Sequence, residues 1–306
     1  MRFTLRRLTY FVAVAEAGSI TEASRRLAIS QPSLSEAIAM LEQSLDVQLF
    51  VRQFKGLTLT RAGSVFLGQA RTLLALAREL EATAGSLGQE LKGEISVGCL
   101  ATLAPFILPT LLNEFAVEYP EIAVATEETG HEQLLSNLRD GSIEMAFTYL
   151  FRIPEAFEYE VFAELPPRIL LAEDHPFATR EALSLEEIAE EPLVLLDIPY
   201  SREYFLGLFQ AAGVEPRIGH RSHSYDMVRG MVGRGWGYGI QCAIPRMPFS
   251  YDGMRLVPVP IAGAAAPIKV VGVGLRRAVQ RRAIEAFIDC SRRYFSEAWL
   301  DVIESG

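Results

Sequence analysis

The sequence predicts a mixed α/β chain with three parts: a small helix-rich N-terminal domain, a long connecting helix and a two-lobed α/β domain. Three observations support this fold class. The 306 residues suffice for about two domains. Apolar residues recur at helical spacing through the first 60 residues, and a longer helical repeat follows them. Beyond residue 92, segments typical of strands alternate with segments typical of helices.

The composition excludes several classes of protein. Half of the residues are hydrophobic and 22% are charged, which is not typical of collagen-like or disordered chains. Three cysteines are too few for a disulfide framework, and the odd number favours a reducing compartment. Glu16 interrupts the only apolar stretch near the N-terminus, and no apolar run is long enough to span a bilayer. We therefore expect a cytoplasmic protein with no membrane partner.

The charge is unevenly distributed along the chain. The total is −9, but residues 1–92 hold 11 Lys and Arg against 8 Asp and Glu, whereas residues 93–306 hold 18 against 30. Such asymmetry is one indication that the N-terminal part contacts a polyanion. An excess of three positive charges is also within ordinary scatter. Whether this part contacts a polyanion must therefore be judged from its sequence motifs.

The N-terminal domain reads as three capped helices. A first helix over residues 4–17 ends at Gly18, and the stretch from Ser19 to Glu22 forms a capping box in which the Glu22 carboxylate can reach back to the cap. Ser30 caps a third helix with Pro32 in its first turn. Its buried side is predicted to consist of Leu34, Ile38, Leu41 and Leu45. Two capped helices separated by a short turn predict a helix-turn-helix, with a three-helix packing module that has no DNA role as the alternative.

The third helix presents polar residues opposite its buried side, and in a helix-turn-helix the N-terminal ones face base edges in the major groove. Glutamine can pair bidentately with adenine, and serine can bond a base or a phosphate. Residues 49–60 then form two short alternating stretches around a turn, which predicts a hairpin wing. The predicted DNA-binding residues are Gln31, Pro32, Ser33, Ser35 and Glu36, with Arg52 and Lys55 on the wing.

The run SITEASRRLAISQPSLSEAIAMLEQSLDVQLFVRQFKGLTLTRAG resembles the winged helix-turn-helix of the LysR-type transcriptional regulators. The resemblance rests on Ala23-Ser24, on residues 30–35, and on Leu49-Phe50-x-Arg52 leading to residues 59–63. It implies that Gln31, Pro32, Ser33, Ser35 and Arg52 contact double-stranded DNA at a pseudo-palindromic operator. Many members carry arginine where this chain has Glu36-Ala37. A carboxylate there cannot pair with phosphate or guanine, although it could accept from a cytosine amine, so base preference does not transfer.

A long helix is predicted from Thr60 to about Gln89. Apolar residues alternate at intervals of four and three, which is typical of a coiled coil, and two reading heads are needed for two DNA half-sites. We therefore expect a homodimer, or a dimer of dimers (homotetramer), with a helix packed on its own chain's core as the alternative. The predicted dimerisation residues are Phe66, Ala70, Leu73, Ala77, Leu80, Ala84 and Leu87. Glycines near residue 88 mark the boundary, giving domains of 1–60, 61–92 and 93–306.

The C-terminal domain is predicted to have parallel strands with helical crossovers, in two lobes that the chain connects twice. Lobe I comprises about 93–163 and 267–306, and lobe II about 164–266. This arrangement is that of a periplasmic-binding-protein-like (type 2) fold, which closes around a ligand by hinge motion. The LysR resemblance implies the same fold, with a small-molecule effector between the lobes.

Effector-binding residues are expected in the loops that follow the strands, where helix N-termini offer unpaired amides. The candidates are Thr102, Thr129, Thr148, Ser201, Arg202 and Ser224, with Thr102 the best match to the family's effector site. Helix capping is the alternative for each serine and threonine. An inward-pointing Arg202 would favour a carboxylate effector, because guanidinium binds that group bidentately.

Other patterns carry less information. Gly233, Gly235, Gly237 and Gly239 follow a helix rather than a strand, so tight turning explains them better than a phosphate loop. His220 and His223 lack further metal-ligating neighbours, and we expect neither metal nor cofactor.

A redox switch through Cys99 with Cys242 or Cys290 is the alternative to inert packing. No catalytic constellation is evident, so the sequence favours a regulator, not an enzyme, over a transport-type binding protein or an α/β enzyme. RNA polymerase is a further partner that the resemblance allows. The effector, the target operons and the sign of regulation are left open.

Overall fold

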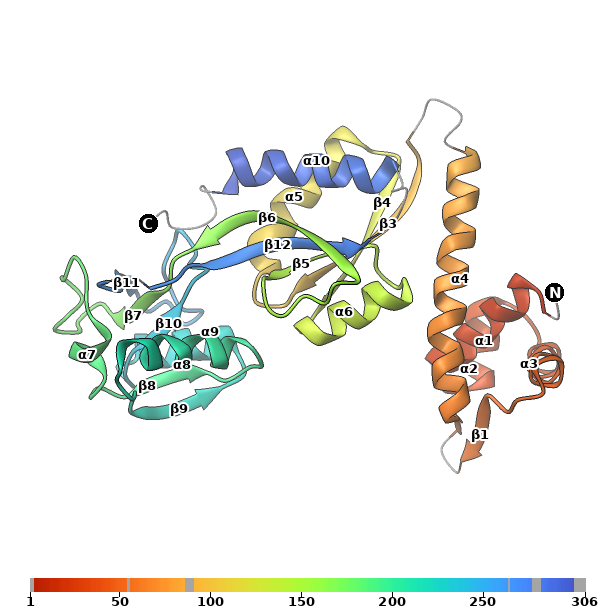
Figure 1. The fold of residues 1–306 in the computed structure, drawn as a ribbon, viewed down its shortest axis with the longest axis horizontal. Helices are drawn as coiled ribbons and strands as arrows, with labels where there is room; N and C mark the ends of the chain where they lie inside the picture. Colours follow the sequence, from red (N-terminus) through yellow and green to blue (C-terminus); the bar gives the residue numbers. More distant parts are fainter. Residues whose placement is uncertain (1–2, 54–55, 86–90, 264, 277–281, 300–306) are drawn as a thin grey trace.

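The computed structural model describes residues 3–53, 56–85, 91–263, 265–276 and 282–299. A winged helical domain and one long helix form one side of the molecule, and a two-lobed α/β domain forms the other (Figure 1). No helix in these described ranges is long and apolar enough to cross a membrane. The fold class is therefore the one that the sequence predicts.

The three N-terminal helices form where the caps predict them. Their bounds are α1 Leu5–Ala17, α2 Ile20–Leu27 and α3 Gln31–Leu45. Ser19 and Ser30 each accept a hydrogen bond from the backbone amide three residues later. The Glu22 carboxylate does not close the predicted capping box: it bonds Arg25 and Arg26 instead, because two guanidinium groups are stronger donors than one amide.

The wing is an antiparallel hairpin of β1 (Phe50–Gln53) and β2 (Gly56–Leu59). Glu42 anchors it from helix α3, since its Oε1 accepts from the backbone amides of Leu49 at 2.7 Å and Phe50 at 3.1 Å. Lys55, predicted for the tip of the wing, lies outside the described residues. The wing is thus tied to the same helix that carries the predicted base-reading residues.

The long helix α4 (Arg61–Gly85) starts directly on the base of the wing. Thr60 caps it: the hydroxyl accepts from the amide of Gly63 at 2.9 Å and donates to the carbonyl of Gln48 at 2.8 Å. A Cβ atom on Gly63 would lie only 2.1 Å from the carbonyl oxygen of Leu49. Glycine is therefore required there for the helix and the wing to approach each other.

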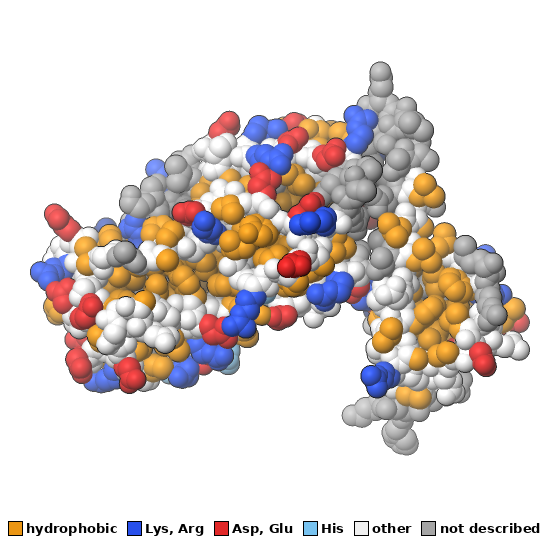
Figure 2. Space-filling model, in the orientation of Figure 1, with side chains coloured by type: hydrophobic (Ala, Val, Ile, Leu, Met, Phe, Trp, Pro, Cys, Tyr) orange, Lys and Arg blue, Asp and Glu red, His pale blue; other side chains and the backbone are white. Residues whose placement is uncertain are grey.

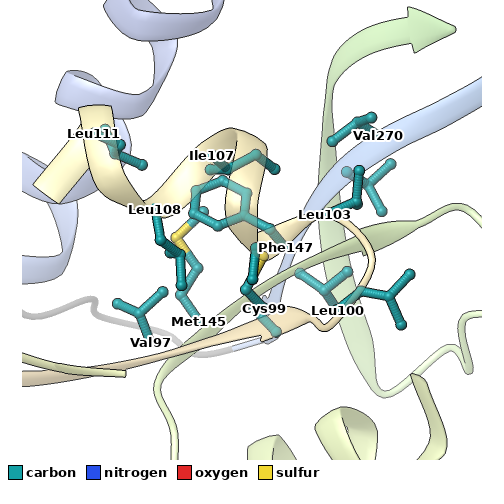
Figure 3. Close-up of a cluster of buried hydrophobic side chains, with 14 of the residues drawn as sticks. Val97, Cys99, Leu100, Leu103, Ile107, Leu108, Leu111, Met145, Phe147 and Val270 are labelled. Carbon is teal, nitrogen blue, oxygen red and sulfur yellow. The ribbon is translucent and has the colours of Figure 1, made fainter. Parts of the chain in front are cut away.

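Lobe I is a five-stranded sheet in the order β4-β3-β5-β12-β6, with α5 and α10 on one face and α6 on the other (Figure 1). Strands β3, β4 and β5 are parallel, whereas β12 runs antiparallel to β5 and β6. Figure 3 shows its buried core, in which Val97, Cys99 and Phe147 of the sheet meet Leu103 and Ile107 of the α5 region. The bounds are β3 Gly93–Leu100, α5 Ala104–Glu118, β4 Ile122–Thr129, α6 His131–Asp140, β5 Met145–Tyr149, β6 Phe157–Leu165, β12 Ile268–Leu275 and α10 Arg282–Glu297.

Lobe II combines an antiparallel sheet, in the order β10-β7-β11, with a parallel pair, β8 and β9. A bridge between Leu193 and Tyr238 connects the two. The bounds are β7 Arg168–Ala172, α7 Leu185–Ile188, β8 Leu193–Leu196, α8 Ser201–Ala212, β9 Ile218–Ser222, α9 Tyr225–Gly233, β10 Gly239–Gln241 and β11 Leu256–Pro260. The chain passes between the lobes twice, after β6 and after β11, as the sequence predicts.

Two details of the α/β prediction are corrected. The sheets are only partly parallel, and strands β6 and β11 were not predicted. Both are edge strands. Strand β6 carries several glutamates on its exposed side, and β11 contains Pro258 and Pro260. Within sheets, proline is found mainly in edge strands. The two prolines of β11 therefore make this segment look unlike a strand in the sequence.

Replacing Gly63 by alanine should lower the free energy of unfolding of the N-terminal domain by about 1–3 kcal/mol, because the new methyl group overlaps the Leu49 carbonyl. Gly68→Ala on the same helix is the control. A Cβ atom there meets nothing within 4 Å, and alanine should add about 0.5–1 kcal/mol. Urea unfolding followed by circular dichroism measures both, and equal effects would contradict the close approach.

Candidate DNA interface and interlobe site

The N-terminal end of α3 presents a polar surface. Gln31, Pro32, Ser33 and Glu36 are exposed, and Ser35 is half-buried. The hydroxyl of Ser33 shares a hydrogen bond of 2.8 Å with that of Ser30. Opposite these residues the helix is fully covered, so the predicted base-reading residues occupy the side that remains accessible.

Helix α2 supports this surface. Thr21 donates to the amide oxygen of Gln31 at 3.3 Å, which orients that side chain. Arg25 and Arg26 bind Glu22 at 2.8 and 3.0 Å while staying 78% and 56% exposed. The guanidinium of Arg25, then that of Arg26, lowers the pKa of the Glu22 carboxyl. Exposed pairs of this kind are weak, so both arginines can exchange Glu22 for phosphate. Sequence reasoning passed over this basic pair.

The predicted dimerisation row on α4 divides into two. Phe66 and Ala70 pack within their own domain: the Phe66 ring lies 5.2 Å from that of Phe11, and Ala70 is 2% exposed. Ala70 belongs to the core of the winged domain, whereas Phe66 is half-buried against that core and also lines an open groove beside Val65. The regular spacing of the apolar residues does not reveal this division. Helix α4 carries two neighbouring apolar faces, and the predicted row includes residues from both.

The second apolar face of α4 is uncovered. Leu73 and Leu80 of the predicted row lie on it with two residues that the prediction omitted, and hydrophobic side chains gather on this side of the winged unit (Figure 2). The exposed fractions are Val65 67%, Leu73 38%, Leu76 51% and Leu80 71%. Ala77 is half-buried. Ala84 lies in α4 without a described side chain, and Leu87 lies outside the described residues.

Two of the predicted effector residues meet between the lobes. Thr102 of lobe I and Ser201, the first residue of α8 in lobe II, line one small cavity together with Tyr149, Tyr204, Tyr225 and Gln241. The cavity volume is about 20 Å³. That is room for a single water molecule, so the structure shows the lobes closed.

The other predicted effector residues already have partners within the chain. Thr148 is buried and shares a 2.9 Å hydrogen bond with Nδ1 of His131. Ser224 is exposed and caps α9. Thr129 is half-buried at the end of β4, where its carbonyl accepts from the amide of Ala101. The polar side chains of Thr148 and Ser224 are thus used for structure.

Arg202 does not line the cavity. Its guanidinium binds Asp197 at 3.0 Å, and Arg221 binds the second carboxylate oxygen at 3.1 Å. These two partners, Arg221 first, lower the pKa of the Asp197 carboxyl. Arg202 was expected to favour a carboxylate effector only if it pointed inward. It is paired with the Asp197 carboxylate of the same chain instead.

A clasp at the lobe junction was missed by sequence reasoning. Tyr200 of lobe II stacks on Phe151 of lobe I at 5.4 Å and 17°, lies 4.9 Å from the His131 ring, and donates its hydroxyl to Glu132. Its backbone φ of +67° lies in the left-handed region, which is strained for a tyrosine. We call these four residues the Tyr200 clasp. Nothing local in the sequence signals a contact between residues so far apart.

The three cysteines are all free. Cys99 and Cys290 are buried, and Cys242 is half-buried. Burial raises the pKa of each thiol, to about 12 for Cys242. Since the thiolate is the reactive form, burial disfavours the reaction of these thiols at neutral pH.

The comparisons with known proteins agree with the architecture. Residues 5–64 match the family model "Bacterial regulatory helix-turn-helix protein, lysR family", and residues 88–296 match "LysR substrate binding domain". The chain is 32% identical to the regulator YnfL of Escherichia coli over 85% of this chain and 88% of YnfL. It is 31% identical to the E. coli regulator OxyR, over 83% and 84% respectively.

Solved structures show the same likeness. HinK, a LysR family transcriptional regulator from Pseudomonas aeruginosa, superimposes with a TM-score of 0.65 at 36% identity, over 96% of this chain and 99% of HinK. CbnR in complex with its target DNA gives 0.68 at 26% identity, over 95% and 99%. The fold and these matches define a DNA-binding transcriptional regulator with an effector domain. The chain belongs to the LysR family of transcriptional regulators.

The burial of the cysteines leads to a prediction. Under native conditions, less than one of the three thiols per chain should react with Ellman's reagent within minutes, whereas all three should react in guanidinium chloride. Absorbance at a fixed reagent excess measures the rates. Rapid reaction of one thiol in the folded protein would contradict the assignment.

Proposed function

We propose that this LysR-type regulator binds a pseudo-palindromic operator as a homodimer, or as a dimer of dimers, and that a small molecule between the lobes alters this binding. The observation that carries the proposal is the N-terminal end of α3, where polar residues are exposed on a helix whose other side is buried. In this scheme, 1–60 is the reading head, 61–92 the dimerisation helix, and 93–306 the effector domain.

The uncovered face of α4 supports the dimer. Val65, Leu76 and Leu80 are large, apolar and at least half exposed on a helix that is too long to be covered by its own small domain. A second copy of the same helix would bury them in coiled-coil fashion. Two half-sites on DNA require two reading heads, and CbnR shows a family member in complex with its target DNA.

The effector is proposed to bind without covalent chemistry. Several relatives are named hydrogen-peroxide-inducible genes activators. In this chain the three thiols are held protonated by burial, whereas the Tyr200 clasp and the interlobe cavity suit reversible opening and closing. We place this activity in the cytoplasm, where promoter DNA and RNA polymerase, the proposed downstream partner, are found.

The proposed reading residues are tested by Gln31→Ala and Ser35→Ala in a gel shift. The probes are the DNA upstream of the chain's own gene and a shuffled sequence of equal length. Each lost base contact should cost about 1–3 kcal/mol of preference, so the ratio of the two affinities should fall by about 5–150-fold.

Gln43→Ala is the matched control, because Gln43 is an exposed glutamine at the other end of the same helix. Its preference should remain that of the unmodified chain. A preference that survives the Gln31 and Ser35 changes would show that other residues read the operator.

The proposed dimer is tested by Leu76→Asp combined with Leu80→Asp. Two carboxylates on the uncovered face of α4 should abolish association, since neither would be paired when buried. Sedimentation velocity should then show the mass of one chain. Tyr159→Asp, at a half-exposed position on the distant strand β6, should leave the mass unchanged. An unaltered mass for the leucine variant would refute the interface.

A further inference from the structure

We propose that the interlobe cavity binds a small carboxylate, with Gln241 and Thr102 donating to its oxygens. The inference rests on the proposed function, since it names the chemical class of the effector. It differs from the expectation based on Arg202, which the structure directs to Asp197 instead. Gln241, which was not among the predicted effector residues, lines the cavity.

The orientation of the Gln241 amide is fixed by a buried arginine. Gln241 is 1% exposed and Arg229 is 2% exposed. Nη1 of Arg229 donates to Oε1 of Gln241 at 3.0 Å, and Nη2 donates to the carbonyl of Phe249 at 3.0 Å. Guanidinium only donates, so a flipped amide would place donor against donor. Nε2 of Gln241 therefore faces away from Arg229 and has no partner among the described residues.

Thr102 supplies a second polar group of the same kind. Its hydroxyl oxygen is buried without a hydrogen-bond partner in the described part of the chain. Gln241 and Thr102 come from different lobes and line the same cavity. A buried donor left unpaired is costly, so two of them in one cavity indicate a ligand that carries hydrogen-bond acceptors.

The local charge favours an anion over a neutral acceptor. Within the described residues, Arg229 has only neutral hydrogen-bond acceptors and no carboxylate in ion-pair contact, although Asp226 lies one turn away on the exposed side of α9. Ser201 in the cavity wall is the first residue of the twelve-residue helix α8, whose N-terminus carries partial positive charge. Both features stabilise a negative charge placed in the cavity.

The size of the cavity and its walls restrict the body of the ligand. About 20 Å³ excludes any organic acid, so the lobes must open for one to enter. The Tyr200 clasp, which joins the two lobes beside the cavity, is the contact that must break. Tyr149, Tyr204 and Tyr225 line the cavity, which suits a flat or short apolar body.

The test uses the full chain and measures thermal unfolding with acetate, propionate and benzoate, each beside its primary amide. At up to about 20 mM, at least one acid should raise the Tm by about 2–5 °C, while its amide should have no effect. If no acid raises the Tm, or if the amides act equally, the assignment to carboxylates is wrong.

Gln241→Glu separates binding from folding. The new carboxylate pairs with Arg229, so the Tm without acid should be equal or higher, but the Nε2 donor and the net positive charge are lost and the acid-induced shift should disappear. Gln210→Glu makes the same change on the exposed side of α8 and should keep the full shift. A shift retained by Gln241→Glu would refute the role of Gln241.

Thr102→Val provides a second readout. Removal of an unpaired buried hydroxyl should raise the Tm of the unliganded chain and reduce the acid-induced shift, whereas a purely structural threonine would give a lower Tm. Gel shifts without acid distinguish the two proposals. Variants that bind DNA normally but ignore acids leave the regulator assignment intact, and failure of all chains to bind DNA would count against the proposed function alone.

Discussion

Arg71 links the reading head, the long helix and the effector domain. Its guanidinium binds Glu16 of α1 at 2.8 Å and Asp140 of α6 at 3.0 Å, so one side chain of α4 joins all three parts of the chain. Burial opposes the charge on Arg71, but the two carboxylates outweigh it and its pKa is raised. A half-buried pair of this kind is worth more than an exposed one, and loss of either partner would leave a charge poorly compensated.

Helix α6 connects this ion pair to the effector cleft. His131 and Glu132 at its N-terminal end hold Tyr200 of lobe II, and Asp140 at its C-terminal end holds Arg71. Ten residues of helix span about 15 Å and move as a rigid unit. Opening of the Tyr200 clasp therefore acts at one end of a helix whose other end is bound to the linker. The physical connection between sensing and DNA reading is short and made of few contacts.

Most of the fold was predictable because its signals are local. Ser19, Ser30 and Thr60 cap helices where the sequence places them, and the alternation of strands and helices predicts both lobes. The contacts that define the site were not predictable, because they join distant segments: Tyr200 with Glu132, and Arg229 with a strand that follows it. The two apolar faces of α4 were not distinguishable for a similar reason. The same helical spacing of apolar residues occurs whether they pack on the chain's own core or remain exposed.

The buried polar atoms without hydrogen-bond partners are unevenly distributed in the described part of the chain, and most of them lie at the junction between the lobes. Of the four unpaired buried atoms in the described residues, two belong to Thr102 and Gln241, which line the interlobe cavity, and one belongs to His131 of the clasp. The fourth, the hydroxyl of Tyr238, lies in the core of lobe II. The strained φ of Tyr200 lies at the same junction. The core around Cys99, by contrast, is apolar and closely packed. A concentration of unpaired polar groups and backbone strain at one junction is expected where a ligand supplies the missing contacts.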